Sequence, residues 1–568
     1  MPGRADRIGG VSDVTTYVGA RLDAARNPGG VVDKALRGAL TVGEELVFDA
    51  GQARLAAARD AVEASLAELL RGRAAITLLL GARSISPRIW TIHGAVGDDI
   101  QLAVRSILEL AIQKHATWRG SGRDLERMPS FLPGHLAVLA KAFALSEVYA
   151  GLLATERRVC KGQSHTVSSI SPLGFDTDDD SEVARLIEIT DARSTASDDP
   201  LSMFGTISAG GGPAEVPFIL AASWVPPSDV SDGAGFAVEL TDAGQTIRTA
   251  DRTTRWGFVD GLGPFQESVA EYDQSLRATA GYGLIDLHAV QHLMSIAILE
   301  RYEGEPSLPP AIEFLGLALV PPEVSILFRD IDGTHPYDAM EPGRAPTMGS
   351  MGRAFDRLLA DPKQIELDSP QVRQPLLPLN EQELVYDLSA ASLFSPMFIE
   401  TTLEGQSRQD FAKDFEKRTH ASIADLGVQP WPSGRAIKKA GRWLTDVDAC
   451  VRVGSLLVVA DCYSSPWTRD LDRGHIKRVR SRADHLVDKL EKWQRQWLGI
   501  TQHHPELLPS GVDQVLPVVV TSGPEWIPSE RQNLWLTPSV PAILTELELR
   551  RLLRPIPRQL DPHLLRVP

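Results

Sequence analysis

Between Gly405 and Ser465 the sequence reads GQSRQDFAKDFEKRTHASIADLGVQPWPSGRAIKKAGRWLTDVDACVRVGSLLVVADCYSS, and three structural elements follow one another in it. Residues 407–426 predict a helix with an apolar stripe and a glycine as its stop. Residues 445–453 and 455–463 predict two strands, joined by a tight turn at Gly454. This stretch therefore predicts a helix followed by a β-hairpin.

Acidic side chains occupy three places in these elements. Glu416 lies in the middle of the predicted helix, beside its apolar stripe. Because side chains alternate along a strand, Asp448 on the first strand and Asp461 on the second can meet across the hairpin, with Asp446 as a neighbour. Asp461 ends an otherwise apolar strand, where burying a carboxylate is costly unless it has a partner. A metal ion is one such partner.

The order and spacing of these residues resemble the PD-(D/E)xK nuclease superfamily, in which a helix containing FE precedes a D-x-D strand and a strand ending in E-C-K. The resemblance implies that Glu416, Asp448 and Asp461 bind a divalent cation. It also implies that these acids are catalytic, together with Tyr463, the residue two positions after the last of them. Carboxylate oxygens suit Mg²⁺, and the implied reaction is Mg²⁺-dependent phosphodiester hydrolysis.

Tyr463 is the point at which the sequence departs from the family, which has a lysine at this position. A phenol with a pKa of about 10 supplies no positive charge, although it can donate a hydrogen bond to water or phosphate. A cation from elsewhere in the chain would restore the charge, and the simpler interpretation of each nearby cation is a surface charge. The nearby cations are Lys438, Lys439, Arg442 and Lys477.

The resemblance extends beyond the motif itself. A long polar helix is expected at 470–497, a buried strand at 513–523, and a short strand with a closing helix at 533–553. With 405–465, these elements give the αβββαβ order of a restriction-endonuclease-like core in the last third of the chain.

A basic run at 469–482 contrasts with the acidic chain around it, since six Lys or Arg residues stand against two Asp residues. Beside a nuclease-like cleft, such a run can contact phosphates, and nearby tryptophans can stack on bases if they are exposed. The alternative is a solvated helix face with the tryptophans in the core. The candidate nucleic-acid contacts are Arg473, Lys477, Arg478 and Arg480, and the tryptophans are Trp431, Trp443 and Trp467.

The length of 568 residues predicts several domains. Helical periodicity dominates the first part, whereas β-like runs at 217–224 and 235–240 and a helical stretch at 285–302 make the middle part α+β. The expected multidomain α/β protein has a mainly helical region at 1–170, an α+β region at 171–367, a proline-containing linker at 368–404 and a nuclease-like domain at 405–568.

The net charge of −16 argues against a grip of the whole protein on nucleic acid or on an anionic membrane, and leaves room for a local basic face. Three cysteines are too few for a disulfide scaffold and lack zinc-ligand spacing. The N-terminal sequence has no apolar signal core. We therefore expect a cytoplasmic protein without a membrane partner.

Three functions remain open. The first is a nucleic-acid-directed protein whose nuclease-like domain keeps a carboxylate metal site but is catalytically impaired or atypical. The second is an inactive nuclease fold that serves as a structural or protein-interaction module. The third is an active Mg²⁺-dependent endonuclease with a relocated or substituted catalytic lysine.

Overall fold

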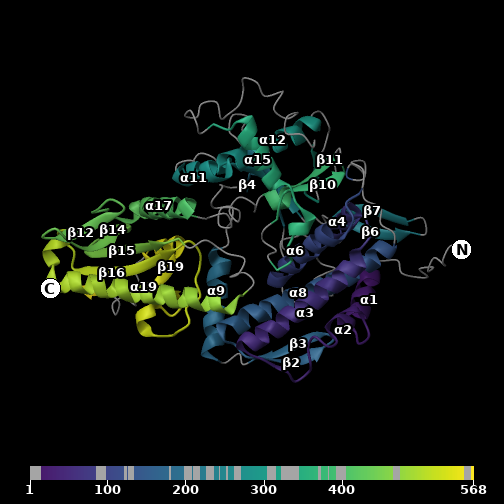
Figure 1. Ribbon diagram of the computed structural model, residues 1–568, viewed down its shortest axis with the longest axis horizontal. Coiled ribbons are helices and arrows are strands. Elements are labelled where there is room, and N and C mark those ends of the chain that lie inside the picture. Colours follow the sequence, from purple (N-terminus) through teal and green to yellow (C-terminus); the bar gives the residue numbers. More distant parts are fainter. Residues whose placement is uncertain are drawn as a thin grey trace.

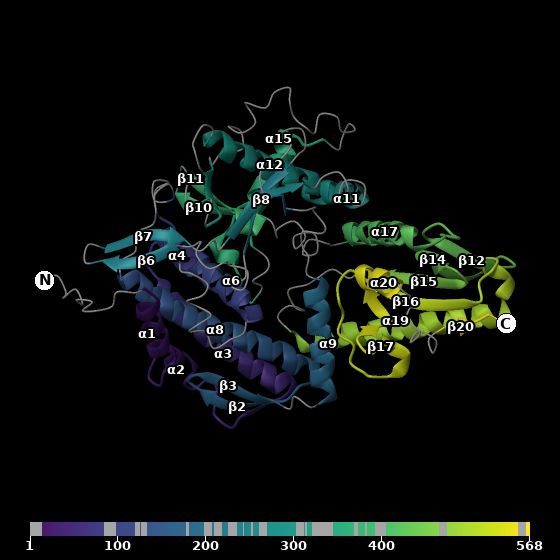
Figure 2. The same cartoon turned by 180° about the vertical axis from the view of Figure 1, so that it is seen from behind.

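The computed structural model is a mixed α/β protein with a mainly helical N-terminal half and several small sheets, including a five-stranded mixed sheet near the C-terminus (Figures 1 and 2). This confirms the coarse fold class expected from the sequence. The structure describes residues 14–84, 98–119, 125, 133–177, 181–197, 207–208, 218–224, 236–241, 244–250, 254–260, 270–302, 312, 315–320, 345–368, 373–380, 383–391, 405–464, 474–554 and 564–567.

Long helices pack side by side in the N-terminal part. Their bounds are α1 Val14–Arg26, α2 Val31–Leu36, α3 Phe48–Leu70, α4 Ala75–Ser84, α6 Asp98–His115 and α8 Pro133–Lys161. The apolar side chains of α3 recur at three- and four-residue steps, and Leu55, Val62 and Leu66 are buried against α8. α3 ends at Leu70 and α4 begins at Ala75, and Gly72 lies between them with a φ of 72° that favours glycine.

One helix in the described part is long and apolar enough to cross a membrane by length and composition, namely Gly134–Lys161 within α8. Its most apolar window is 83% buried inside the protein. The neighbours that cover it are α1, α3 and α6 (Figure 1). A central helix surrounded by other helices needs such an apolar surface on all sides.

The middle part combines short strands with helices. Its elements are β1 Glu45–Leu46, β2 His165–Ile170, β3 Leu173–Thr177, α9 Glu182–Ser197, β4 Ile207–Ser208, β5 Phe218–Trp224, β6 Phe236–Thr241, β7 Gly244–Ala250, β8 Thr254–Asp260, α11 Ala270–Ala280, α12 Leu284–Arg301, β9 Leu317–Val320 and α15 Met348–Leu358. The strands expected at 217–224 and 235–240 correspond to β5 and β6, and the helix expected at 285–302 corresponds to α12.

The proline-containing segment expected as a linker contributes two strands to a sheet. β10 (Leu376–Asn380) pairs with β11 (Glu383–Asp387), and β11 pairs with β9. The structure therefore differs from the expectation of an extended connection here. Pro378 is compatible with this arrangement because β10 is an edge strand, where a missing N–H group need not interrupt the ladder.

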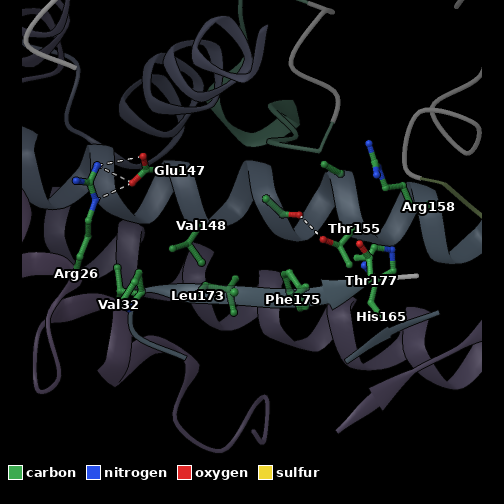
Figure 3. A pocket seen from close by; sticks show the side chains of 14 residues that line it. Arg26, Val32, Glu147, Val148, Thr155, Arg158, His165, Leu173, Phe175 and Thr177 are labelled. Atoms are coloured by element: carbon green, nitrogen blue, oxygen red, sulfur yellow. Dashed lines mark hydrogen bonds and ion pairs between the residues drawn. The ribbon is translucent and has the colours of Figure 1, made fainter. Parts of the chain in front are cut away.

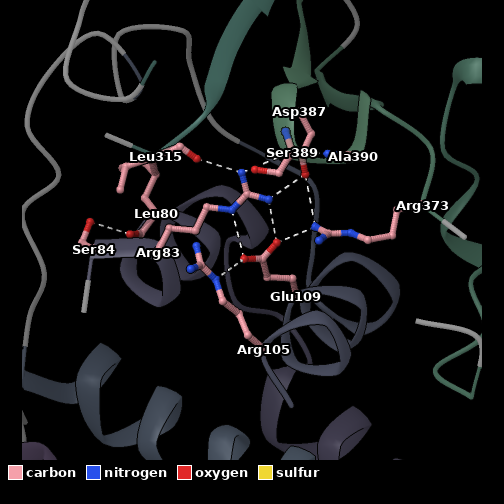
Figure 4. Close-up of polar contacts among 10 residues, drawn as sticks. All are labelled: Leu80, Arg83, Ser84, Arg105, Glu109, Leu315, Arg373, Asp387, Ser389 and Ala390. Atoms are coloured by element: carbon pink, nitrogen blue, oxygen red, sulfur yellow. Dashed lines mark hydrogen bonds and ion pairs between the residues drawn. The ribbon is translucent and has the colours of Figure 1, made fainter. Parts of the chain in front are cut away.

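A buried cluster of charges joins the helical half to β11 (Figure 4). The Arg83 guanidinium on α4 lies 2.6 Å from both the Glu109 carboxylate on α6 and the Asp387 carboxylate on β11. Arg105 binds Glu109, and Arg373 binds both acids. Because Arg83 is only 1% exposed, its charge is held by these partners rather than by water.

The C-terminal part is a sheet between two helices. Its elements are α17 Gly405–Ser422, β12 Arg435–Lys439, β13 Arg442–Val447, β14 Ala449–Val453, β15 Leu456–Tyr463, α19 Ile476–His503, β16 Gln514–Thr521, β17 Trp535–Thr537, β18 Val540–Pro541, β19 Ile543–Thr545, α20 Glu546–Leu552 and β20 Leu565–Arg566. β14 and β15 form an antiparallel hairpin, and α19 carries the chain to β16, which is parallel to β15. β16 also pairs with β19 and β20. α17 covers one face of this sheet and α19 the other (Figure 1).

Candidate functional site

Asp448 and Asp461 lie opposite each other at one end of the β14–β15 hairpin. Ala449 pairs with Ala460, and extending this antiparallel register by one residue sets Asp448 against Asp461. The Asp448 carboxylate accepts a 2.8 Å hydrogen bond from the backbone N–H of Cys462. The juxtaposition expected from the alternation of side chains is therefore present in the structure.

The single strand expected at 445–453 is two strands that belong to different sheets. β13 pairs with β12, whereas β14 pairs with β15, and Asp448 lies between β13 and β14. Asp446 is exposed on β13 and accepts a 2.8 Å hydrogen bond from the Trp443 indole. Periodicity cannot reveal the change of sheet, because the chain is extended on both sides of Asp448.

Helix α17 brings Glu416 to the same end of the hairpin. Phe415 and Ile423 are buried in one core with Ala449 and Ala460, so the apolar stripe of α17 lies on β14 and β15. Glu416 follows Phe415 in the chain and is therefore held beside this contact, half-buried. The expected helix with its apolar stripe thus positions the third acid.

The three carboxylates influence one another's protonation. Burial and, after it, the charges of Glu416 and Asp461 raise the pKa of Asp448 to about 8. Burial also raises the pKa of Glu416, with a further contribution from Asp461. The charge of Lys489 lowers the pKa of both groups. At neutral pH this group of carboxylates therefore retains a proton when no other cation neutralises it.

Lys489 on α19 supplies a positive charge beside Tyr463. Its ammonium nitrogen lies 2.7 Å from Asp461 Oδ1 and 5.6 Å from the centroid of the Tyr463 ring. Tyr463 is only partly buried, and its ring also lies 5.3 Å from that of His485. The position that the signature gives to lysine is thus filled by a phenol, with the ammonium group of another residue next to it.

The packing of α19 on β15 explains why Lys489 reaches this place. Four residues of helix rise about 6 Å, and two residues of strand rise about 6.6 Å, so one turn back along α19 matches two residues forward along β15. The contacts run in step: Trp493 with Val459, Lys489 with Asp461, and His485 with Tyr463. Lys489 was not among the cations expected at this site, although the four-residue spacing of His485, Lys489 and Trp493 is the signal that places them on one helix face.

The cations expected from proximity in sequence have other positions. Lys439 lies 2.7 Å from the Glu506 carboxylate, and Lys438 and Arg442 are exposed on the β12–β13 hairpin. Lys477 is exposed near the start of α19, about 18 Å along the helix from Lys489. The structure therefore favours a more distant residue in sequence as the cation of this site.

Of the candidate phosphate contacts that the structure describes, some are exposed to solvent and one packs on the helical half. Lys477 and Arg478 are exposed, whereas the Arg480 guanidinium lies 4.7 Å from the centroid of the Phe48 ring on α3. The Gln52 side chain donates a 2.7 Å hydrogen bond to the carbonyl of Gly474. The start of α19 is thus docked on α3. Arg473 lies outside the described residues.

The candidate stacking residues also differ from one another. Trp431 is half-buried and stacks on Trp497, with ring centroids 6.2 Å apart. Trp443 is 50% exposed on β13. Trp467 lies outside the residues that the structure describes.

A separate pocket of about 330 Å³ lies between α8 and the β2–β3 hairpin (Figure 3). Val148, Leu173 and Phe175 form its apolar wall, and an ion pair of 2.8 Å between Arg26 and Glu147 lies at one end. It shares no residue with the carboxylate site. Its lining suits an apolar body, and its charged end is already neutralised internally.

Within the described part of the chain, no three His, Cys, Asp or Glu side chains form a group that could hold a metal ion as they lie. Asp461 is instead paired with Lys489. Comparison of the whole chain with protein-family models, with curated proteins and with solved structures finds no match.

Proposed function

We propose that the part of the chain from Gly405 onward is a PD-(D/E)xK-type core that acts on nucleic acid, with Lys489 in the role of the missing signature lysine. The observation that carries this proposal is the contact of the Lys489 ammonium with Asp461, beside Tyr463. Among the functions left open by the sequence, it favours the endonuclease with a relocated lysine.

The order of elements supports the proposal. A helix bearing Glu416 precedes a hairpin bearing Asp448 and Asp461, and α19 then crosses to a parallel strand, β16. The expected αβββαβ order has this helix, hairpin and crossover in common with the structure. Two further strands, β19 and β20, extend the sheet on the other side of β16.

The chemistry of the donor set fits a hard divalent cation, although the acids do not form a ready-made cage. Glu416, Asp448 and Asp461 offer carboxylate oxygens, and their mutual repulsion is part of what raises the pKa of Asp448 to about 8. A bound Mg²⁺ would polarise the phosphate and lower the pKa of water. The chain's own residues would position that ion and, through Lys489, keep a positive charge beside the reacting phosphate.

Cation binding offers a test that does not depend on activity. The proton on Asp448 must leave before its carboxylate can bind a cation, so affinity for Mg²⁺ or Mn²⁺ should rise with pH up to about 8. Isothermal titration calorimetry measures this dependence. The Asp448→Asn variant should lose it, and pH-independent or absent binding in the wild type would contradict the metal site.

The test of function is cleavage of single- and double-stranded DNA and RNA by the full chain with Mg²⁺ or Mn²⁺. We expect Asp461→Ala to abolish cleavage and Lys489→Met to slow it by about 100-fold or more, since a preorganised charge at the reacting group is lost. Adding Tyr463→Lys to Lys489→Met places a lysine at the signature position and should restore part of the activity.

The matched control is Lys492→Met, which removes an exposed charge from the same helix and should leave cleavage unchanged. Cleavage that is insensitive to Lys489→Met would reject the relocated lysine. If neither the wild type nor Tyr463→Lys cleaves any substrate, hydrolysis at this site is excluded.

A second candidate function, an interaction module with a nuclease-like fold, is favoured by the docking of this part on the rest of the chain. Arg193 on α9 is buried, and it binds the Glu548 carboxylate at 2.7 Å and the carbonyl oxygens of Glu525 and Ile543 at 2.8 and 3.1 Å. Such an anchor suits a scaffold. Absence of cleavage by the wild type and by every variant would support this function instead.

A further inference from the structure

The β12–β13 hairpin contains a bulge that turns one tryptophan outward. Ile437 pairs with Thr445 and Lys438 pairs with Trp443, so Leu444 is an extra residue on β13. Without it, Trp443 would alternate onto the same face as the buried Thr445. The bulge instead sets Trp443 across from the exposed Lys438, on the opposite face.

The indole of Trp443 is exposed and held in place. Half of the residue's surface is accessible, and its Nε1–H donates a 2.8 Å hydrogen bond to Asp446 Oδ1, three residues further along β13. The extra residue Leu444 packs against the core that contains Trp493 and Trp497. A fixed, solvent-facing ring on a hairpin anchored from behind is a platform on which a flat group can stack.

Three cations lie on the same hairpin as this platform: Lys438 pairs with Trp443 itself, Arg442 precedes Trp443, and Arg435 pairs with Val447 further along β13. Arg435 and Lys438 lie on β12 and Arg442 on β13, all three exposed. Within the described residues none of them forms an ion pair or a side-chain hydrogen bond, in contrast to Lys439, which binds Glu506. The chain has a net charge of −16, whereas these unpaired cations give the hairpin locally positive charge.

We propose that the β12–β13 hairpin binds single-stranded nucleic acid, with a base stacked on Trp443 and phosphates contacted by Arg435, Lys438 and Arg442. A half-exposed ring on a hairpin that also carries unpaired cations matches the two parts of a nucleotide, whereas an anionic membrane or an acidic peptide would use the charges alone. A single strand is required because stacking on Trp443 needs an unpaired base.

The hairpin leads directly into the carboxylate site. β13 ends at Val447 and Asp448 follows, so a strand bound at Trp443 lies roughly 16 Å from Asp448 along β13. Delivery of a bound strand to the three acids is the consequence, and this consequence rests on the proposed function. The binding itself does not require hydrolysis.

The test is fluorescence anisotropy with labelled oligonucleotides and the full chain, in EDTA so that no cleavage occurs. Single-stranded DNA and RNA arms distinguish the sugar, and a duplex arm tests the need for unpaired bases. We expect Trp443→Ala to weaken single-strand binding by roughly 5- to 100-fold and Trp443→Phe to retain most of it, since the stacking face remains. Each change of Arg435, Lys438 or Arg442 to Gln should reduce the magnitude of the slope of log K against log salt concentration by about 0.7.

The matched control is Leu498→Ala, which removes another exposed apolar side chain from the same part of the chain. Single-strand binding by a wild type that cleaves no substrate with Mg²⁺ or Mn²⁺ would reject the proposed function and keep this inference. Cleavage with unaltered affinity in Trp443→Ala would reject the inference and keep the function. Equal affinity for poly-glutamate or for duplex would also overturn it, because neither offers an unpaired base.

Discussion

Two groups of charges in this protein are built in opposite ways. In the cluster of Figure 4, three arginines stand against the two acids Glu109 and Asp387, deep in the interior. At the end of the β14–β15 hairpin, three acids face one ammonium group, that of Lys489, and both partners of the Lys489–Asp461 pair remain partly exposed. The first group holds more positive than negative charges, whereas in the second the carboxylates outnumber the ammonium group.

This difference separates a structural role from a chemical one. The arginine cluster joins α4, α6 and β11, segments that are far apart in the sequence, and it neutralises its acids completely. The carboxylate site leaves Asp448 with a pKa raised to about 8, so a proton or another cation must complete it. Perturbed pKa values occur at functional sites and in structural ion-pair networks alike. The two groups differ in direction, since the arginines hold the pKa of Glu109 well below its ordinary value, whereas burial and the neighbouring acids raise the pKa of Asp448.

The largest expected effect comes from removing the central cation of the arginine cluster. Arg83→Met leaves Glu109 and Asp387 buried beside two arginines at the edge of the cluster, and should lower the free energy of unfolding by about 3–5 kcal/mol. Urea unfolding followed by circular dichroism measures the change. The control is Arg37→Met, whose partner Asp33 is on the surface and whose loss should have little effect.

A smaller effect of opposite sign is expected at Asp448. Its pKa is raised in the folded state, so between about pH 4 and pH 8 the folded protein binds more protons than the unfolded chain. The contribution of Asp448 to stability is therefore complete below about pH 4 and is lost as the pH rises toward 8. Relative to the wild type, Asp448→Asn should gain roughly 2–4 kcal/mol across this window, because it carries no charge to bury.

Thermal unfolding of both proteins from pH 4 to pH 8.5 measures this difference. Asp488→Asn, an exposed acid on α19, is the control and should follow the wild type at every pH. At pH 8, added Mn²⁺ should restore stability to the wild type and not to Asp448→Asn. Parallel pH profiles for the wild type and Asp448→Asn would show that Asp448 is ionised in the folded protein.

Local patterns in the sequence predicted the parts of the site that lie within one helix and one hairpin. The stripe on α17 placed Glu416, and alternation across the turn at Gly454 placed Asp448 opposite Asp461. These relations depend on residues close together in the chain, where period and register are sufficient.

Other features depend on how elements pack, and the sequence did not reveal them. Lys489 reaches the site because α19 runs back along β15, and Trp443 faces solvent because Leu444 is one residue too many for its strand. The strands β10 and β11 were not expected because the prolines in and before β10 are typical of connections, and Pro378 is compatible with a sheet because β10 is an edge strand. Tertiary packing decided each of these cases.

The smallest expected effect comes from making the same kind of substitution as at Arg83, a cation to methionine, in the carboxylate site. Lys489→Met removes the cation that pairs with Asp461 in the carboxylate site, yet this pair is partly exposed, with side chains 25% and 19% accessible. Solvent screens such a pair, so the cost should be about 0.5–1 kcal/mol at pH 7, against 3–5 kcal/mol for Arg83→Met.

The lost charge should also raise the pKa of Asp448 further, moving the end of the pH-dependent window above 8. Urea unfolding at several pH values measures both changes, with Lys492→Met as the control. A cost equal to that of Arg83→Met would make Lys489 a structural ion-pair partner and remove the basis for assigning it a catalytic charge.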